Sequence, residues 1–298
     1  MLSILIPTYN YNVWPLVKQL YEQCSTLGID FELLVYDDCS PNPVNENSNI
    51  NSLKAANFVQ LPQNIGRSAI RNKLAHDAKY EDLLFLDADT MPVSDQFIQN
   101  YLSVISTATE IIYGGIIYQK EQPQQDQILR WVYGNKREAL PVSERNKMPH
   151  LRFLTLNFCI KKTVFQKLSF NEDIPNLRHE DTLFAMNAKQ QNIAVLHIDN
   201  PIIHHGLESS EVFLKKSEEA TIVLKQFVED GLMTPSDTAL SYMASRIENA
   251  QLKGFVLKSL SLFKSKMKRN LLSKNPSLFI FDLYRLQLYL ETKGSTNE

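Results

Sequence analysis

Cysteine is scarce in this sequence, since Cys24, Cys39 and Cys159 are the three cysteines among 298 residues. They lie far apart, and no two of them form a C-x-x-C pair. An odd number at such spacing argues against a disulfide framework and against a structural zinc site. The scarcity of cysteine therefore favours a reducing compartment.

Long apolar runs and a strong net charge are also lacking. No window approaches the roughly 20 consecutive apolar residues that a membrane span needs. The apolar residues 3–6 behind Met1 are too few for a signal peptide, and no basic flank precedes them. The formal net charge of -2 gives no overall attraction to nucleic acid. We therefore expect a cytoplasmic protein that has no nucleic-acid partner.

The sequence does contain a regular alternation of short apolar runs and helical patterns. The expected strands cover residues 2–7, 31–36, 58–61, 82–86, 111–117, 153–160 and 193–198. The expected helices cover residues 14–24, 68–78, 94–107 and 181–190, with another beginning at 162, and Ser68 is the expected N-cap of the second. This alternation predicts an α/β fold with a mostly parallel, Rossmann-like sheet flanked by helices.

The character of the chain changes at two places. Residues 118–150 are polar and rich in glutamine, which predicts an irregular lid or binding loop. Beyond Gly206 the pattern is helical throughout. We therefore predict an α/β domain over residues 1–206 and a C-terminal helical extension over residues 207–298.

Polar clusters follow three of the expected strands. They are Thr8-Tyr9-Asn10, Asp37-Asp38 and Asp87-Ala88-Asp89. In open parallel sheets, ligands bind outside the carboxyl ends of the strands, so the fold would bring these clusters to one edge. Carboxylates gathered there repel each other unless a cation lies between them, which suggests Mg²⁺ or Mn²⁺.

Five segments in order carry a family resemblance: LSILIPTYN, FELLVYDDCS, NIGRSAIRN, LLFLDADT and RHEDTLF. Together they resemble the motif series of glycosyltransferase family 2, over about residues 2–206. The resemblance implies a GT-A fold and an inverting, metal-dependent transfer of a hexosyl or N-acetylhexosaminyl group from a nucleotide sugar, with UDP-sugars favoured. Cys39 departs from the glycine usual after Asp38. No Q-x-x-R-W motif follows Asp181, which argues against a processive synthase.

The resemblance assigns one group of residues to the nucleotide sugar. Pro7 and Tyr9 are similar to residues that hold the base, and Asp38 to the carboxylate that accepts from the base edge. The remaining members of the group are Asn64, Gly66, Arg71 and Asp87. Arg71 is expected near the diphosphate, although a salt bridge on a helix surface explains it equally well.

A second group of residues is assigned to the metal and to catalysis. Asp89 is expected to bind Mn²⁺ or Mg²⁺, with Asp87 at the metal or the ribose and His204 as a further ligand, while His205 stays as its rival. The resemblance makes Asp181 the general base, with Glu180 orienting it or contacting the acceptor. The alternative is that these acidic residues have no catalytic role and only cap strand ends and the start of a helix.

Two other functions compete with glycosyl transfer to a hydroxyl of a glycan or lipid-linked glycan. A nucleotidyltransferase of sugar phosphates needs a glycine-rich, basic loop after the first strand, but residues 8–12 contain neither glycine nor lysine nor arginine. A non-catalytic protein that only binds nucleotide sugars is disfavoured because Asp87, Asp89 and Asp181 are all present.

The tail contains one strongly basic amphipathic segment. Apolar residues recur at helical spacing at Val256, Leu260, Phe263, Met267 and Leu271, and residues 258–274 contain six basic residues and no acidic one. One interpretation is a helix that packs on the core and exposes a basic face, which the apolar spacing favours. The other is a peripheral contact with anionic lipid at the inner face of the membrane, suited to a lipid-linked acceptor.

Overall fold

The computed structural model describes residues 1–106, 108–173 and 179–292. The chain divides into two compact units. The sheet unit comprises Met1–Gln119, Ala139–Asn176 and Glu180–Gly206, and the helical unit comprises Lys120–Glu138, Leu177–His179 and Leu207–Glu298. The first unit ends at the residue where we expected the α/β domain to end. The division into a domain over residues 1–206 and an extension over residues 207–298 stays a prediction, and the helical unit also includes Lys120–Glu138.

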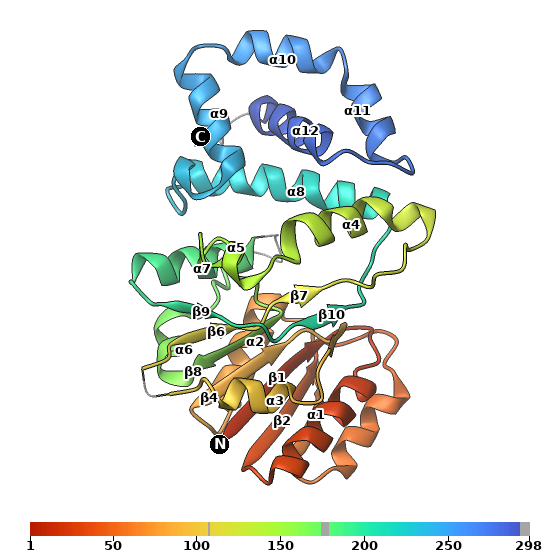
Figure 1. Ribbon diagram of the computed structural model, residues 1–298, viewed down its shortest axis with the longest axis vertical. Helices are drawn as coiled ribbons and strands as arrows, with labels where there is room; N and C mark the ends of the chain where they lie inside the picture. The colour runs from red at the N-terminus through yellow and green to blue at the C-terminus, as the bar shows by residue number, and fades with distance from the viewer. Residues whose placement is uncertain (107, 174–178, 293–298) are drawn as a thin grey trace. The chain divides into compact units, whose positions relative to one another are not determined.

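A seven-stranded sheet forms the centre of the sheet unit, in the order β3-β2-β1-β4-β8-β6-β9 (Figure 1). The strands are β1 (Leu2–Thr8), β2 (Phe31–Asp37), β3 (Ala56–Gln60), β4 (Asp82–Leu86), β6 (Ile111–Tyr113), β8 (Asn157–Lys161) and β9 (Val195–His197). Strands β1 to β4 are mutually parallel, and β8 runs antiparallel to both of its neighbours. The predicted mostly parallel α/β sheet is confirmed.

Helices flank this sheet and follow its strands closely. They are α1 (Trp14–Leu27), α2 (Arg67–Asp77), α3 (Phe97–Leu102), α5 (Val142–Arg145), α6 (Lys162–Leu168) and α7 (Glu180–Gln190), with a 3₁₀ helix η1 at Asn45–Ser52. Gly66, and not Ser68, is the N-cap of α2, so the predicted cap was wrong. Helix α3 is shorter than expected, and the predicted end at Thr107 lies outside the described residues.

An aromatic cluster fixes α6 and α7 against the sheet. Phe85 of β4 stacks on Phe158 of β8 and on Phe165 of α6, with ring centroids 4.9 and 5.3 Å apart. Phe184 of α7 stacks on Phe170 at 4.5 Å. Burial of these large rings is the main stabilising contribution here, and it holds the start of α7 in place.

A second, three-stranded sheet has the order β5-β10-β7. Its strands are β5 (Thr90–Pro92), β7 (Ile116–Ile117) and β10 (Ile202–His204). The single strand predicted over residues 111–117 is therefore two strands in two sheets, and that prediction was wrong. Gly114 and Gly115 separate them, and Gly115 has a φ of 100°, which a residue with a side chain rarely adopts.

The helical unit is built around one apolar cluster. Its helices are α4 (Ile128–Tyr133), α8 (Ser210–Glu229), α9 (Ala239–Asn249), α10 (Lys253–Ser261), α11 (Lys264–Leu271) and α12 (Leu278–Glu291), with short turns η2 (Gln125–Gln127), η3 (Gly134–Glu138) and η4 (Pro235–Asp237). Figure 1 shows α12 between α8 and the α10–α11 pair. Leu129, Leu214, Met267, Leu271, Phe281 and Tyr284 form the buried cluster.

Two further features of the helices bear on the predictions. The stretch 118–150, expected to be irregular, contains helices α4 and α5, and Leu129 of α4 lies in the apolar cluster of the helical unit. The sequence analysis missed α4 because the helix has only 6 residues, too few for a helical period to stand out within a polar stretch. In the described part of the chain, no helix has both the length and the apolar character needed to cross a bilayer.

Candidate active site

The three polar clusters lie at the carboxyl ends of adjacent parallel strands. Thr8 at the end of β1 is in register with Asp37 at the end of β2, and β4 pairs with the other side of β1. The loops after β1, β2 and β4 therefore begin at one edge of the sheet. This is the edge at which open α/β sheets bind ligands.

Asp38 holds the loop that begins α2. Its Oδ1 accepts a hydrogen bond from the backbone N–H of Ile65 at 2.7 Å, and its Oδ2 accepts from that of Gly66 at 3.0 Å. The Asn64 side chain donates to the Asp38 carbonyl oxygen at 3.0 Å. The structure thus brings three predicted nucleotide residues together. Each carboxylate oxygen keeps a second lone pair for a donor on a base edge.

The neighbouring turn shows why a glycine would be favoured at the position of Cys39. Cys39 has a φ of 60°, where a glycine is unstrained and other residues cost about 1 kcal/mol or more. Asp37 Oδ1 accepts from the Ser40 N–H at 2.7 Å, and Ser40 Oγ accepts from the Asn10 N–H at 2.7 Å. These bonds join the loops after β1 and β2. Beside them, Pro7 lies within β1 and Tyr9 is half exposed at the rim.

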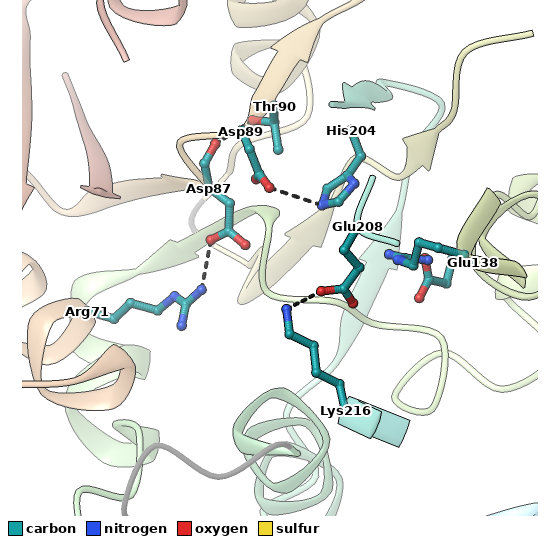
Figure 2. A network of polar contacts seen from close by, with 9 residues as sticks. Arg71, Asp87, Asp89, Thr90, Glu138, His204, Glu208 and Lys216 are labelled. Carbon is teal, nitrogen blue, oxygen red and sulfur yellow. Dashed lines mark hydrogen bonds and ion pairs between the residues drawn. The ribbon is translucent and has the colours of Figure 1, made fainter. Parts of the chain in front are cut away.

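Arg71 is a buried link between two of the predicted groups. Its Nη2 donates to Asp87 Oδ1 at 2.7 Å, and its Nη1 lies 3.9 Å from Glu180 Oε1 (Figure 2 shows the bond to Asp87). Burial disfavours the charged guanidinium, but Asp87 and Glu180 outweigh it, so the pKa of Arg71 is raised. Its Nε and Nη1 are buried and have no hydrogen-bond partner among the described residues. Arg71 is therefore no surface salt bridge, and it retains donor capacity for an anion.

Asp89 and His204 form the other close pair of the site. His204 Nε2 lies 3.5 Å from Asp89 Oδ2, and Figure 2 shows the two side chains directed at each other. His204 is on β10, opposite Thr90 of β5, so the small sheet places it beside the D-x-D segment. His205 Nδ1 lies 3.2 Å from Gln119 Nε2. The His205 backbone N–H donates to the Asp89 carbonyl oxygen at 2.8 Å, so His204 is the histidine whose side chain faces the Asp89 carboxylate.

The surroundings of this pair fit a divalent cation. Gly206 leaves room for Asp89, because a Cβ at this position would collide with Asp89 Oδ2. His204 Nδ1 is buried, and no residue in the described part of the chain is its hydrogen-bond partner. Across residues 1–106, 108–173 and 179–292, no three His, Cys, Asp or Glu side chains converge as a complete cage. A carboxylate and an imidazole that leave other positions to phosphate oxygens and water are a donor set suited to Mn²⁺ or Mg²⁺.

Glu180 and Asp181 begin helix α7. Asp181 Oδ1 accepts from the backbone N–H of Thr182 at 2.7 Å. Burial, and next the charge of Glu180, raise the pKa of Asp181 to about 6, against the opposing effects of Thr182 and Arg71. A carboxylate with such a pKa is suited to accept a proton near neutral pH. Arg178 of the RHEDTLF motif lies outside the described residues.

One residue near Asp89 was missed by the sequence analysis. Burial, and next the negative charge of Asp89, raise the pKa of the Tyr11 hydroxyl. Tyr11 therefore lies close enough to the D-x-D segment to sense its charge. Its position directly after Thr8-Tyr9-Asn10 was the available signal.

Comparison with known proteins gives a consistent result. The family model "Glycosyl transferase family 2" matches residues 3–172. The mannosyltransferase PcManGT from Pyrobaculum calidifontis, in complex with GDP-Man and Mn²⁺, is similar with a TM-score of 0.54 and 12% identity, over 97% of this chain and 84% of that one. Residues 1–349 of S. aureus TarS, in complex with UDP-GlcNAc, give a TM-score of 0.50 and 17% identity, over 97% and 89%. No curated protein sequence matches.

Proposed function

Because the chain belongs to glycosyl transferase family 2, we propose that it transfers a sugar from a nucleotide diphosphate donor to an acceptor hydroxyl, with inversion. The observation that carries this proposal is the ion-pair link between the D-x-D segment and the E-D pair. Arg71 reaches Asp87 at 2.7 Å and Glu180 at 3.9 Å. Arg71 thus connects the D-x-D segment, which would bind the leaving group, with the E-D pair, which would act on the acceptor.

The donor would bind along the rim formed by the loops after β1, β2 and β4. Pro7 and Tyr9 would hold the base, while Asp38 would accept from the base edge. Asn64 and Gly66 would line the nucleotide, Asp87 would contact the ribose or the water around the cation, and Arg71 would donate to the diphosphate. Two observations support these roles: the ring of Tyr9 is exposed, and the Nε and Nη1 of Arg71 donate no hydrogen bond to any residue that the structure describes.

Asp89 and His204 would hold Mn²⁺ or Mg²⁺, with Asp87 nearby. When bound, the cation neutralises the negative charge that develops on the nucleoside diphosphate leaving group. Among the proteins of similar fold, PcManGT is in complex with GDP-Man and Mn²⁺, and TarS with UDP-GlcNAc. These complexes support a hexosyl or N-acetylhexosaminyl donor here, and we favour a UDP-sugar.

Asp181 would act as the general base in a single displacement. The acceptor oxygen attacks the anomeric carbon, the bond from that carbon to the phosphate oxygen breaks, and the acceptor proton passes to Asp181. Glu180 would orient the site through Arg71 and keep the pKa of Asp181 high. A nucleotidyltransferase receives no support, because residues 8–12 carry no group that would hold a triphosphate.

We place the reaction in the cytoplasm, with a glycan or lipid-linked glycan as acceptor and attachment to the inner face of the membrane. The test is a donor screen that measures nucleoside diphosphate release from UDP-, GDP- and dTDP-sugars with Mn²⁺, with and without a chelator. We expect release from one donor class, lost on chelation. Donor binding with no turnover on any acceptor would contradict the proposal and favour a non-catalytic binding protein.

A further inference from the structure

Helix α10 of the helical unit exposes an apolar face. Leu252, Phe255, Leu262 and Phe263, which we call the α10 face, are 50%, 74%, 76% and 51% exposed. Residues three, four and seven positions apart lie on one side of a helix, so these four share the outward stripe of α10 and the turn that follows it. On its other side, α10 packs on α12, where Val256 and Leu260 are partly buried. Large rings exposed in a row are uncommon on a surface that contacts only water.

The segment of the chain that carries the α10 face is rich in basic residues and contains no acidic residue. Between Glu248 and Asp282 the chain contains seven basic residues and no acidic one. Lys253 pairs with Glu248 at 3.0 Å and Lys264 with Glu291 at 2.8 Å. Within the described residues, no carboxylate pairs with the five others, which are all exposed: Lys258, Lys266, Lys268, Arg269 and Lys274. Lys266 Nζ lies 5.8 Å from the centre of the Phe263 ring.

We propose that the α10 face, with the cations beside it, docks this protein on an anionic lipid surface. Aromatic and aliphatic side chains enter the headgroup boundary, while lysines with long apolar stems reach the lipid phosphates. The sequence analysis placed the lipid contact on the basic amphipathic segment, whereas the exposed apolar residues lie elsewhere in the structure. Met267 and Leu271, the apolar face of the basic helix α11, belong to the buried cluster. Helix α11 therefore contributes only cations, and the apolar contact belongs to α10.

This inference deepens the proposed attachment to the membrane by naming the surface that makes it, and its test does not depend on glycosyl transfer. The full chain is floated with vesicles of phosphatidylcholine alone and with vesicles that also contain phosphatidylglycerol. We expect binding only to the anionic vesicles, weakened by salt. The double variant Phe255→Ser, Leu262→Ser should weaken binding about ten-fold or more, because it removes two exposed apolar side chains. Lys258→Glu should weaken it about five-fold or more.

Tyr242→Ser is the matched control. Tyr242 is 50% exposed on α9 of the same unit, so its loss removes a similar ring without changing the α10 face; binding should be unchanged. Retained nucleoside diphosphate release, or an unchanged circular dichroism spectrum if the protein releases none, reports that each variant folds. Failure of the unmodified chain to bind anionic vesicles, or equal binding by all variants, would overturn the proposal. So would a dimer in sedimentation that the Phe255, Leu262 variant abolishes, because the face would then join two copies.

Discussion

Arg71 is the residue on which the candidate site depends most. It is buried on α2, bonded to Asp87 and close to Glu180. A buried guanidinium must be compensated by carboxylates, and removal of one partner leaves an uncompensated charge. The pairing therefore holds the D-x-D segment and the start of α7 in a fixed relation within the sheet unit.

At the residue scale, Asp181→Asn should abolish transfer and leave donor binding intact. The amide cannot accept the proton of the acceptor, and the expected loss in kcat is about 100-fold or more. Calorimetric titration with UDP should give an unchanged affinity. Asp95→Asn, at an exposed position of the same unit, is the control and should keep full activity. Near-normal activity of Asp181→Asn would remove Asp181 as the base.

The pH dependence of kcat should carry the signature of the same carboxylate. A base works when deprotonated, and the pKa of Asp181 is raised to about 6, so the rate should fall as the pH drops through about 6. Glu180→Gln should shift this fall to lower pH, because the negative charge of Glu180 helps to keep the pKa of Asp181 high. A pH–rate profile of both proteins tests this. An unshifted acid limb in Glu180→Gln would mean that another group controls it.

His204→Ala should weaken the binding of Mn²⁺ by about 10-fold or more, because the loss of a group that only supports a metal ligand already costs about 10- to 100-fold in affinity. The measurement is a Mn²⁺ titration followed by electron paramagnetic resonance in the presence of UDP. His205→Ala is the matched control, since the His205 side chain contacts Gln119, and its bond to the Asp89 carbonyl oxygen comes from the backbone N–H, which alanine keeps. Equal losses in the two variants would contradict the placement of His204.

At the scale of elements, the break between β6 and β7 decides where the candidate metal ligand lies. Strand β7 leaves the main sheet and pairs with β10, whose His204 is opposite Thr90. Buried side chains close the crossing: Asn157 Nδ2 donates to the carbonyl oxygens of Gly115 and Asn200, at 2.8 and 3.0 Å. The small sheet is thereby fixed beside the D-x-D segment.

Gly114→Ala should therefore destabilise the protein. A Cβ at Gly114 would lie 2.5 Å from Asn157 Nδ2 and 2.6 Å from the Tyr101 hydroxyl, so this buried network must move. We expect a loss of about 1–3 kcal/mol in the free energy of unfolding, measured with urea. Gly254→Ala, where a Cβ meets nothing within 4 Å, should not destabilise. An unchanged midpoint for Gly114→Ala would show that the crossing is loosely packed.

At the scale of the whole molecule, the chain combines a sheet unit that holds every candidate site residue with a helical unit that holds the α10 face. Each unit has a buried apolar cluster of its own. Binding of the nucleotide sugar by the sheet unit and binding of anionic lipid by the helical unit can thus be tested separately. The two proposals made for them stand or fall independently.

Binding of UDP with Mn²⁺ should stabilise the whole protein. A ligand that binds only the folded state adds about 2.7 kcal/mol at a concentration of about 100 times its Kd. We expect the thermal midpoint to rise with UDP and Mn²⁺ together, and the rise to disappear with chelator or in Asp89→Asn. A rise of the same size with UDP alone would show that the cation takes no part in binding.

The family, the strands β1 to β4 and the edge at which the polar clusters gather could all be predicted from the amino-acid sequence. Local apolar patterns and residues at strand ends carry this information, because hydrophobic periodicity fixes strands and parallel strands end at a common edge. It did not reveal that α4 belongs to the helical unit, that residues 111–117 form two strands, or that Gly66 caps α2. Three features became visible in the folded chain alone. Arg71 bridges Asp87 and Glu180, the side chain of His204 rather than that of His205 faces the Asp89 carboxylate, and α11 buries its apolar side while α10 exposes one. These are outcomes of packing between segments distant in sequence, which no local pattern encodes.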